Sequence, residues 1–326
     1  MRTNDHHVLI IIPRSQTATC GLADHASVIK TELERIGAAV QIEHMQTHLS
    51  VERSIPILLE FTPLAYSRLG LSWPLLLQVL RWRLNDCRVI TYFHELPFSN
   101  GRQWKRKLAA MLQRCYCVLL AAASSSSVQN QETGSRWLKV LCGAHRLSFL
   151  PTCSNMGESQ DAPKPENRPL QVVVFGSPGK RRHAHALVAS QGGYRRLFGA
   201  NVSVIDIGEL MQLPDKIATE VSALGLLPVE EIQNHLLSSR FGFFYSEPDQ
   251  FSKSGVFAAY CAHGVVPIIA HGTPDQPIHH LTPEDITSCS RRFANPDAVW
   301  QSCRTWHHQF SASACAGHIY KLAYES

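Results

Sequence analysis

The stretch FGFFYSEPDQFSKSGVFAAYCAHGVVPIIA, residues 241–270, decides the fold. It opens with an apolar run, passes through a polar turn, and closes with a second apolar run, Val265 to Ile269. Between the two runs, Val256, Ala259 and His263 follow the spacing of one helix face. Short apolar runs of this kind are typical of buried strands in a parallel sheet. Strand, turn, helix and strand in this order predict one unit of a doubly wound α/β domain.

The same alternation runs through the rest of the chain. In the first half we predict a basic helix over residues 102–115, followed by a strand, CVLLAAA, over residues 117–123. Residues 157–170 are polar and proline-rich, as in a linker, and the alternation restarts at VVVFG, residues 172–176. We therefore predict an α/β fold of two tandem Rossmann-like, doubly wound domains that face a cleft.

Composition and charge indicate which ligands we do not expect the protein to bind and where in the cell we expect it. The 326 residues are 44% hydrophobic and 17% charged, which suits a globular protein with a substantial core. The net charge is only +5 and no long run of Lys or Arg occurs, so we expect no nucleic-acid partner. Five consecutive apolar residues before Pro13 are too few for a signal peptide or a membrane span. We expect a cytoplasmic protein with at most peripheral contact at the inner membrane face.

The 17 histidines raise the question of a metal site. Several occur as adjacent pairs, such as His6–His7 and His279–His280, and adjacent side chains on a strand or helix point in different directions. No His-Glu-x-x-His motif is present. We therefore expect neither a metal ion nor another cofactor.

Four stretches lie where predicted strands end, which is where doubly wound sheets bind ligands. PRSQTATCGLADHA contains Gly21, which would let the backbone approach a ligand, or simply permit an ordinary loop. YFHELPF places His94 and Glu95 directly after a strand, where a histidine can donate to a ligand or shuttle a proton. A lone histidine is more often structural, so both interpretations stay open.

The other two stretches combine glycine turns with cations. VVVFGSPGKRR places Lys180 and Arg181 behind a glycine turn, which suits a diphosphate but also fits a solvated basic helix start. At a helix start, small residues leave backbone N–H groups open to a phosphate, although a serine there can also merely cap the helix. The residues of this fourth stretch are Ser252, Lys253, Ser254 and Gly255.

Taken together, these stretches resemble the glycosyltransferases of the GT-B fold, particularly the family-four group, which is retaining and depends on nucleotide sugars. CGLADHA is similar to the C-G-x-x-D-Y-[ST] loop of their first domain, and YFHELPF to their His-Glu strand end. FTPLAYSRLGLSWP resembles their third-strand region, PTCSNM the segment entering the linker, and FSKSGVFAAYCAHGVVPII the signature of the nucleotide-binding domain. The W-x-x-x-F-S-x-S-A pattern from Trp306 to Ala314 is similar to their terminal helices. The six motifs occur in the right order.

The resemblance implies a donor site in the second domain. Residues 252–255 would bind the phosphates of a nucleoside diphosphate sugar, helped by Lys180 and Arg181, and the loop of Gly21 would close over the diphosphate. No metal would be needed, because fixed N–H dipoles and cations stabilise the departing diphosphate.

The resemblance also implies the reaction and the domain boundaries. His94 and Glu95 would be the catalytic side chains, approaching the sugar from a first domain that admits a glycan, a lipid-linked or a small-molecule acceptor. The expected activity is that of a hexosyltransferase-type glycosyltransferase in polysaccharide biosynthesis. The boundaries are an acceptor-side domain over 1–156, a linker over 157–170, a donor-binding domain over 171–300 and terminal helices packing back across the domains over 301–326.

One departure from the family pattern matters. Members usually have two Glu residues eight positions apart, and this chain has Phe251 and Ala259 there. The later carboxylate normally grips the ribose hydroxyls, a role for which Glu247 is the nearest substitute. The missing pair leaves two alternatives: a non-catalytic nucleotide-sugar-binding partner of another transferase, and a sugar-nucleotide epimerase of the same fold.

Overall fold

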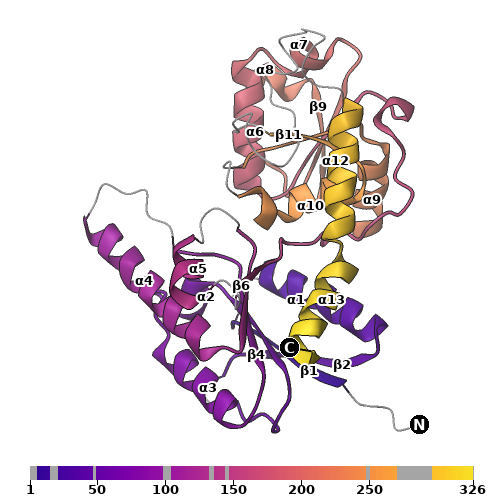
Figure 1. Ribbon diagram of the computed structural model, residues 1–326. Helices are drawn as coiled ribbons and strands as arrows, with labels where there is room; N and C mark the ends of the chain where they lie inside the picture. Colours follow the sequence, from indigo (N-terminus) through magenta and orange to yellow (C-terminus); the bar gives the residue numbers. More distant parts are fainter. Residues whose placement is uncertain are drawn as a thin grey trace. The chain divides into compact units, whose positions relative to one another are not determined.

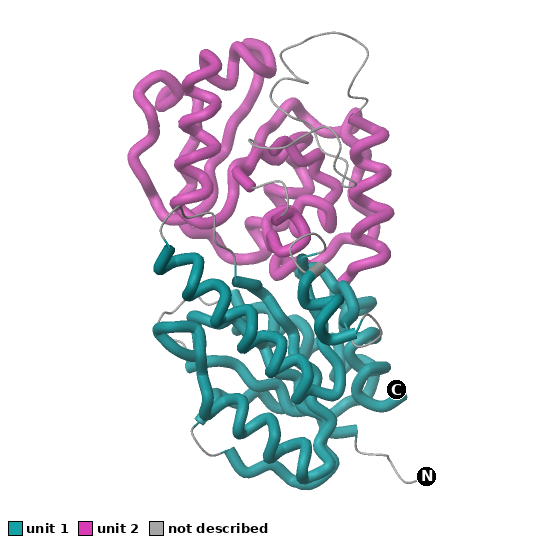
Figure 2. The backbone as a smooth tube through the Cα atoms, turned by 60° about the vertical axis from the view of Figure 1, so that its left-hand side comes forward, with its two compact units in different colours: residues 1–152, 312–326 teal, residues 153–311 magenta. Residues whose placement is uncertain are grey.

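The structure is a computed structural model of the chain (Figure 1). It describes residues 6–14, 21–46, 49–97, 104–131, 136–143, 147–246, 250–269 and 296–325. The chain forms two compact units, shown in teal and magenta in Figure 2. Unit 1 comprises residues 1–152 and 312–326, and unit 2 comprises residues 153–311.

Unit 1 is built on a six-stranded sheet in which all neighbouring strands are parallel, in the order β2-β1-β3-β4-β5-β6. Its strands are β1 (His6–Ile12), β2 (Ala38–His44), β3 (Ile57–Phe61), β4 (Val89–Phe93), β5 (Ser126–Gln129) and β6 (Leu147–Phe149). Its helices are α1 (Gly21–Arg35), α2 (Pro63–Tyr66), α3 (Trp73–Leu84), α4 (Trp104–Ala123), α5 (Arg136–Cys142) and α13 (Ala312–Tyr324). Every residue of β3 and β4 is buried, as expected for central strands covered on both faces.

Unit 2 has a five-stranded parallel sheet in the order β11-β10-β7-β8-β9. Its strands are β7 (Gln171–Phe175), β8 (Ser203–Ile207), β9 (Val221–Gly225), β10 (Phe241–Phe244) and β11 (Val266–Ile269). Its helices are α6 (Pro178–Ser190), α7 (Tyr194–Phe198), α8 (Asp215–Ala218), α9 (Val229–Ser238), α10 (Gly255–Ala262) and α12 (Pro296–Gln309). The two sheets confirm the predicted fold class of two Rossmann-like, doubly wound halves.

The segments expected to join the two halves belong to individual units. Residues 157–170, expected to be a linker, lie in unit 2, where Arg168 is buried and donates to the carbonyl oxygens of Leu236, Ser239 and His263. The terminal region, expected over 301–326, forms α12 in unit 2 and α13 in unit 1.

One predicted strand is wrong. Residues 117–123, CVLLAAA, form the second half of α4, and the strand that follows is the more polar SSVQ of β5. Leu and Ala are strong helix formers, and burial of Cys117, Leu120 and Ala121 follows the spacing of a helix face. A short apolar run alone does not distinguish a strand from a buried helix segment.

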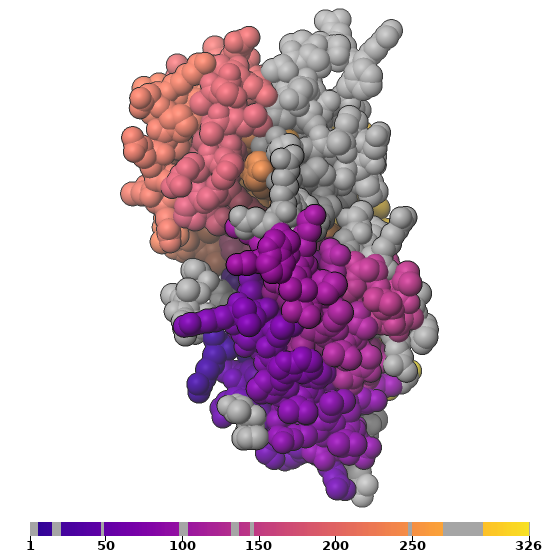
Figure 3. All heavy atoms as spheres, turned by 90° about the vertical axis from the view of Figure 1, so that its left-hand side faces the viewer, coloured from indigo at the N-terminus to yellow at the C-terminus, as the bar shows by residue number. Residues whose placement is uncertain are grey.

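Helices α3 and α4 pack together and expose apolar side chains at helical spacing. Figure 3 views the face on which these purple elements lie. We call this set the α3–α4 stripe: Trp73, Leu77, Leu80 and Leu84 on α3, and Trp104, Leu108, Met111 and Leu119 on α4. The exposed cations Lys105, Arg106 and Lys107 lie in the first turn of α4. None of the helices described by the structure is both long and apolar enough to cross a membrane.

Candidate functional site

The carboxyl end of β7 is the point where the strand order of unit 2 reverses. β8 pairs on one side of β7 and β10 on the other, so the connections after β7 and β10 diverge at this edge. Open parallel sheets bind their ligands at such a switch point. The two sequence stretches that we predicted to bind a diphosphate are the connections after these two neighbouring strands.

The structure brings these two stretches into contact at Gly176. This residue has a φ of +120°, and a Cβ added to it would lie 2.8 Å from Cγ2 of Val256 in the first turn of α10. A side chain at position 176 would therefore strain the backbone and would clash with the Val256 side chain unless that side chain moved. The glycine turn before α6 and the start of α10 consequently lie side by side at the switch point.

The start of α10 is capped by one of the predicted serines. The Oγ of Ser254 accepts a hydrogen bond from the backbone N–H of Phe257 at 3.3 Å. Ser252 and Ser254 are buried, whereas Lys253 and Gly255 are half-buried. The cap uses the Ser254 hydroxyl, so the positive end of the helix and the Lys253 ammonium are the features that suit an anion here.

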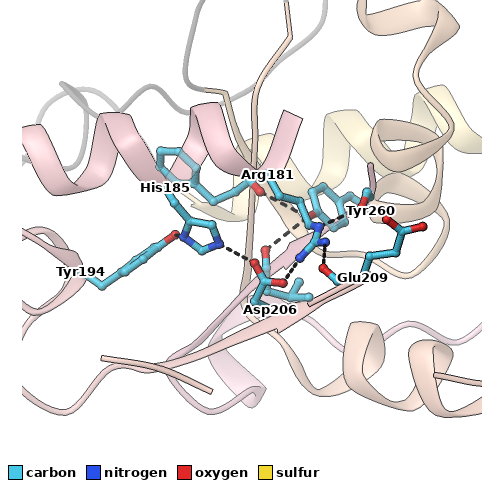
Figure 4. A network of polar contacts seen from close by, with 9 residues as sticks. Arg181, His185, Tyr194, Asp206, Glu209 and Tyr260 are labelled. Carbon is cyan, nitrogen blue, oxygen red and sulfur yellow. Dashed lines mark hydrogen bonds and ion pairs between the residues drawn. The ribbon is translucent and has the colours of Figure 1, made fainter. Parts of the chain in front are cut away.

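The other two predicted cations differ from each other. Lys180 is half-buried in the first turn of α6. Arg181 is 1% exposed and donates to the carbonyl oxygens of Gly176 and Glu209 and to the carboxylate of Asp206 (Figure 4). Arg181 therefore holds the glycine turn from within unit 2. Its direct contact with a phosphate stays a prediction that this geometry does not support.

Asp206 lies at the centre of a buried network that sequence reasoning missed (Figure 4). One oxygen accepts from Arg181 and the other from Nε2 of His185, while the Tyr194 hydroxyl donates to His185 Nδ1 at 2.9 Å. Burial raises the pKa of Tyr194 well above its ordinary value, so this hydroxyl stays a donor. The signal was present in the sequence, because an acid inside the apolar strand NVSVIDI needs a buried partner.

In unit 1, the predicted residue His94 belongs to a second buried cluster. It follows β4 directly, and its backbone N–H donates to the carbonyl of Phe61 at 2.9 Å. Its Nε2 is hydrogen-bonded to Oε2 of Glu60. The other oxygen of this carboxylate, Oε1, is hydrogen-bonded to Nδ1 of His25 at 3.0 Å. Glu60 comes from β3 and His25 from α1, so three elements meet at this edge of the sheet. We call His25, Glu60 and His94 the His–Glu–His cluster.

Burial and mutual contact set the charges in the His–Glu–His cluster. Burial alone would raise the pKa of the Glu60 carboxyl, but electrostatic attraction and hydrogen bonds from His25 and His94 outweigh it and lower that pKa to about 2. For His94, burial is the largest effect and lowers the pKa, although Glu60 acts in the opposite direction. At neutral pH, Glu60 is therefore a carboxylate and His94 a neutral imidazole.

The His–Glu–His cluster also meets the distance requirement for a metal site. Its three potential ligand atoms lie within 4.8 Å of one another, and imidazole with carboxylate is a ligand set that zinc accepts. In the structure the two nitrogens are bonded to the carboxylate oxygens instead. The expectation that the protein needs no metal or other cofactor stays a prediction.

The remaining predicted residues have varied positions. Glu95 is exposed beside His94, and Gly21 is the exposed first residue of α1, where an added Cβ would meet nothing within 4 Å. Glu247 lies outside the described residues. Phe251 and Ala259, at the positions of the family's two carboxylates, are buried in the apolar core of unit 2. Carboxylates there would have to be buried in this chain.

Comparison with solved structures identifies the fold. No family model and no curated protein matches the sequence. An alpha-glucosyltransferase in complex with UDP and a 13-mer DNA containing an HMU base has 11% identity and a TM-score of 0.60, covering 98% of this chain and 99% of that one. WaaG, a glycosyltransferase involved in lipopolysaccharide biosynthesis, has 11% identity and a TM-score of 0.54, covering 98% and 100%.

An isomerase of the same fold is similar as well. A putative UDP-N-acetylglucosamine 2-epimerase from Listeria monocytogenes has 8% identity and a TM-score of 0.55, covering 97% of this chain and 95% of that one. The resemblance to GT-B glycosyltransferases is thereby confirmed at the level of the fold. At these identities, the activity of the chain has to be argued from its own residues.

Proposed function

We propose that this protein is a glycosyltransferase that moves a sugar from a nucleoside diphosphate donor to a glycan, lipid-linked or small-molecule acceptor. The observation that carries the proposal is the contact between Gly176 and Val256. It joins a glycine turn and the starts of α6 and α10 at the switch point of unit 2, with Lys253 two residues before α10. Converging helix starts beside a cation suit a diphosphate, and the negative charge that develops on a departing diphosphate would be stabilised there without a metal.

The first domain would supply the group that contacts the sugar. His94 is at the carboxyl edge of the unit 1 sheet and is held by Glu60, with exposed Glu95 next to it. In the proposal, His94 contacts a sugar hydroxyl and Glu95 lines the same edge. Lys180 and Lys253 hold the diphosphate, and Arg181 supports the turn that does so.

A thermal-shift screen tests the donor site. UDP, GDP, ADP, TDP and CMP, alone and as their common sugar conjugates, are added to the full chain. A nucleotide present at about 100 times its Kd should add roughly 2.7 kcal/mol of stability. Lys253→Ala should weaken that binding by about tenfold, because a hydrogen bond to a charged group is lost. No response to any nucleotide, or an equal response from Lys253→Ala, would contradict the donor site.

We also propose that the acceptor reaction takes place at the cytoplasmic face of a membrane. The α3–α4 stripe combines exposed apolar side chains with Lys105, Arg106 and Lys107, a pattern that suits an interface with anionic lipid. In flotation with vesicles containing phosphatidylglycerol, the chain should rise with the lipid, and the double variant Leu108→Ser/Met111→Ser should largely remain behind. Equal flotation of the two proteins would contradict a role for the stripe.

Two other functions remain as alternatives. The apolar core positions of Phe251 and Ala259 favour a non-catalytic nucleotide-sugar-binding partner, since the carboxylates expected there are absent. The similar fold of the epimerase keeps isomerisation of a nucleotide sugar open. Proton NMR of the donor incubated with the protein separates the three functions. Slow release of free sugar supports a transferase, a changed sugar bound to the nucleotide supports an epimerase, and an unaltered but bound donor supports the partner.

A further inference from the structure

We propose that Glu60 and His25 hold His94 in a single tautomer, protonated on Nε2, so that its Nδ1 meets a ligand only as a hydrogen-bond acceptor. The group it recognises is then a hydroxyl. Identifying that hydroxyl with the sugar or its acceptor rests on the proposed function, whereas the tautomer rests on the His–Glu–His cluster alone.

The chemistry of Glu60 determines which ring nitrogens carry a proton. A carboxylate has acceptor oxygens and no proton to donate. Its Oε1 faces Nδ1 of His25 at 3.0 Å, and its Oε2 faces Nε2 of His94. Each of these nitrogens must therefore carry a proton. The two histidines consequently have opposite tautomers, with His25 protonated on Nδ1 and His94 on Nε2.

His94 is held rigidly by its surroundings. Glu60 is fully buried in β3, opposite Tyr92 of β4 in the register of the sheet. The Tyr92 ring stacks on the His94 ring with centroids 4.4 Å apart, and its hydroxyl donates to the carbonyl of Leu150 at 2.7 Å. The His25 ring packs edge-on against His94 from α1, at 4.8 Å. These contacts pack the His94 ring on two sides, and a flip of the ring would take Nε2 away from Glu60.

The protonation state of the His94 ring depends on the groups around it. The charged and titratable groups that face His94 are Glu60 from β3, His25 from α1, Tyr92 from β4 and Glu95 in the following residue. Both oxygens of Glu60 already accept a hydrogen bond, and burial of the His94 ring disfavours its charged form. His94 then has no second proton, and Nδ1 presents a lone pair.

Nδ1 of His94 is the ring nitrogen that a ligand would contact. Within the described ranges of the chain, His94 Nδ1 has no hydrogen-bond partner, and about 10% of the His94 side chain is exposed. An unprotonated nitrogen cannot donate to the oxygens of a diphosphate, but it accepts readily from an O–H group. His94 is thereby assigned to a hydroxyl group, and the diphosphate is left to Lys253 and the helix starts of unit 2.

The decisive experiment is long-range ¹H–¹⁵N correlation NMR on the ¹⁵N-labelled full chain at neutral pH. The pattern of ring couplings reports which nitrogen of each histidine is protonated, and His94→Gln and His25→Gln assign the signals. We expect His94 with its proton on Nε2 and His25 with its proton on Nδ1. A proton on Nδ1 of His94, in either a neutral or a doubly protonated ring, would overturn the proposal. So would stoichiometric zinc in the purified protein whose removal changes both rings.

A variant connects the tautomer to the reaction. The amide of Glu60→Gln offers one acceptor and one donor, so only one imidazole keeps its original bond and the other changes tautomer. We expect about a tenfold loss of kcat with little change in the KM for the donor, together with a shifted pH profile. Glu43→Gln, which removes a carboxylate from β2, separated from β3 by β1, should behave as the wild type. Unchanged ring signals in Glu60→Gln would overturn the positioning role.

If Glu60→Gln does not fold, the NMR tautomers of the unmodified chain still test the proposal. The two levels of inference also fail separately. The expected tautomers in a protein that transfers no sugar would retain the positioning role and refute the proposed function. The opposite tautomer in an active transferase would refute the positioning role and retain the proposed function.

Discussion

Among the residues that the structure describes, each unit has a buried carboxylate that accepts hydrogen bonds through both of its oxygens. Glu60 in unit 1 is bonded to two imidazoles, whereas Asp206 in unit 2 is bonded to one imidazole and one guanidinium. A guanidinium keeps its charge at every pH at which proteins fold, so the charge of Asp206 is always balanced. The partners of Glu60 are imidazoles, which can themselves gain or lose a proton, so Glu60 has no permanently charged partner.

The two clusters also end in different kinds of group. Through Arg181, the Asp206 network reaches the backbone carbonyls of Gly176 and Glu209 and thereby fixes two loops. The Glu60 cluster ends in the side chain of His94, which is partly exposed. A buried carboxylate thus fixes loops in one unit and holds a partly exposed histidine in the other.

The largest effect is expected from Asp206→Asn. The change leaves Arg181 buried beside a neutral group, and breaking a buried ion pair from one side typically costs about 3–5 kcal/mol. Denaturation by urea, followed by hydrogen exchange of β7 and β8, should show that loss in unit 2. Glu209→Gln is the matched control, because Arg181 uses only the backbone carbonyl of that residue. Equal stability of the two variants would remove the structural role assigned to Asp206.

Acid should weaken unit 1 through Glu60. A carboxyl whose pKa is lowered to about 2 stabilises the folded state above its ordinary value of 4.5, and this contribution disappears as pH falls from 4.5 towards 2. The shift corresponds to roughly 3 kcal/mol. His94, whose pKa is lowered by burial, adds a loss that begins as pH falls below its ordinary 6.5. Hydrogen exchange in β3 and β4 at pH 7 and pH 3 measures the combined effect.

The comparison for the acid experiment is Glu60→Gln. Its uncharged amide cannot release or bind the proton concerned, so the part of the loss below pH 4.5 should be absent. If the wild type and Glu60→Gln lose stability in parallel between pH 4.5 and pH 3, the lowered pKa of Glu60 is contradicted.

The two histidines should separate function from structure. His94→Ala is expected to lower kcat by about 100-fold, equivalent to about 2.7 kcal/mol of transition-state stabilisation, with donor affinity nearly unchanged. His185→Ala, which removes a partner of Asp206 and Tyr194, should lower stability while the folded fraction keeps its kcat. Calorimetric titration with the donor nucleotide and steady-state rates measure both. A similar rate loss in the two variants would mean that the clusters do not differ in the way described.

The sequence was informative wherever a pattern depends on local spacing. Apolar runs such as VLIII and VVVFG predicted buried strands, and the structure has β1 and β7 there. The prediction of a strand for CVLLAAA was wrong because a short apolar run is compatible with a buried strand and with a buried helix. Tertiary packing places Cys117 and Leu120 in the core as part of a helix. Residues Asp206 and Glu60 carried a detectable signal, an acid in an apolar strand, but nothing local revealed their partners.

The partners of the site residues could not be predicted from local sequence either. His94 was singled out from its place after a strand, yet its neighbours His25 and Glu60 are 69 and 34 residues away in sequence. Pairing of β3 with β4 brings Glu60 to it, and packing of α1 brings His25. Arg181 looked like a phosphate ligand because its spacing behind Gly176 is the same for a residue that faces solvent and for one that turns inward. Direction of a side chain at a helix start is a three-dimensional property that neighbouring residues do not encode.

The division of the chain has a consequence for its synthesis. Unit 1 contains the first residues but also α13, which packs against α1 and buries Cys315, Ala316 and Ile319. Every residue of unit 2 therefore leaves the ribosome before unit 1 has its last helix. Domains tend to fold as units while the chain is being made. The unit that is started first is thus the last to be complete, and until then the face of α1 that receives α13 is uncovered.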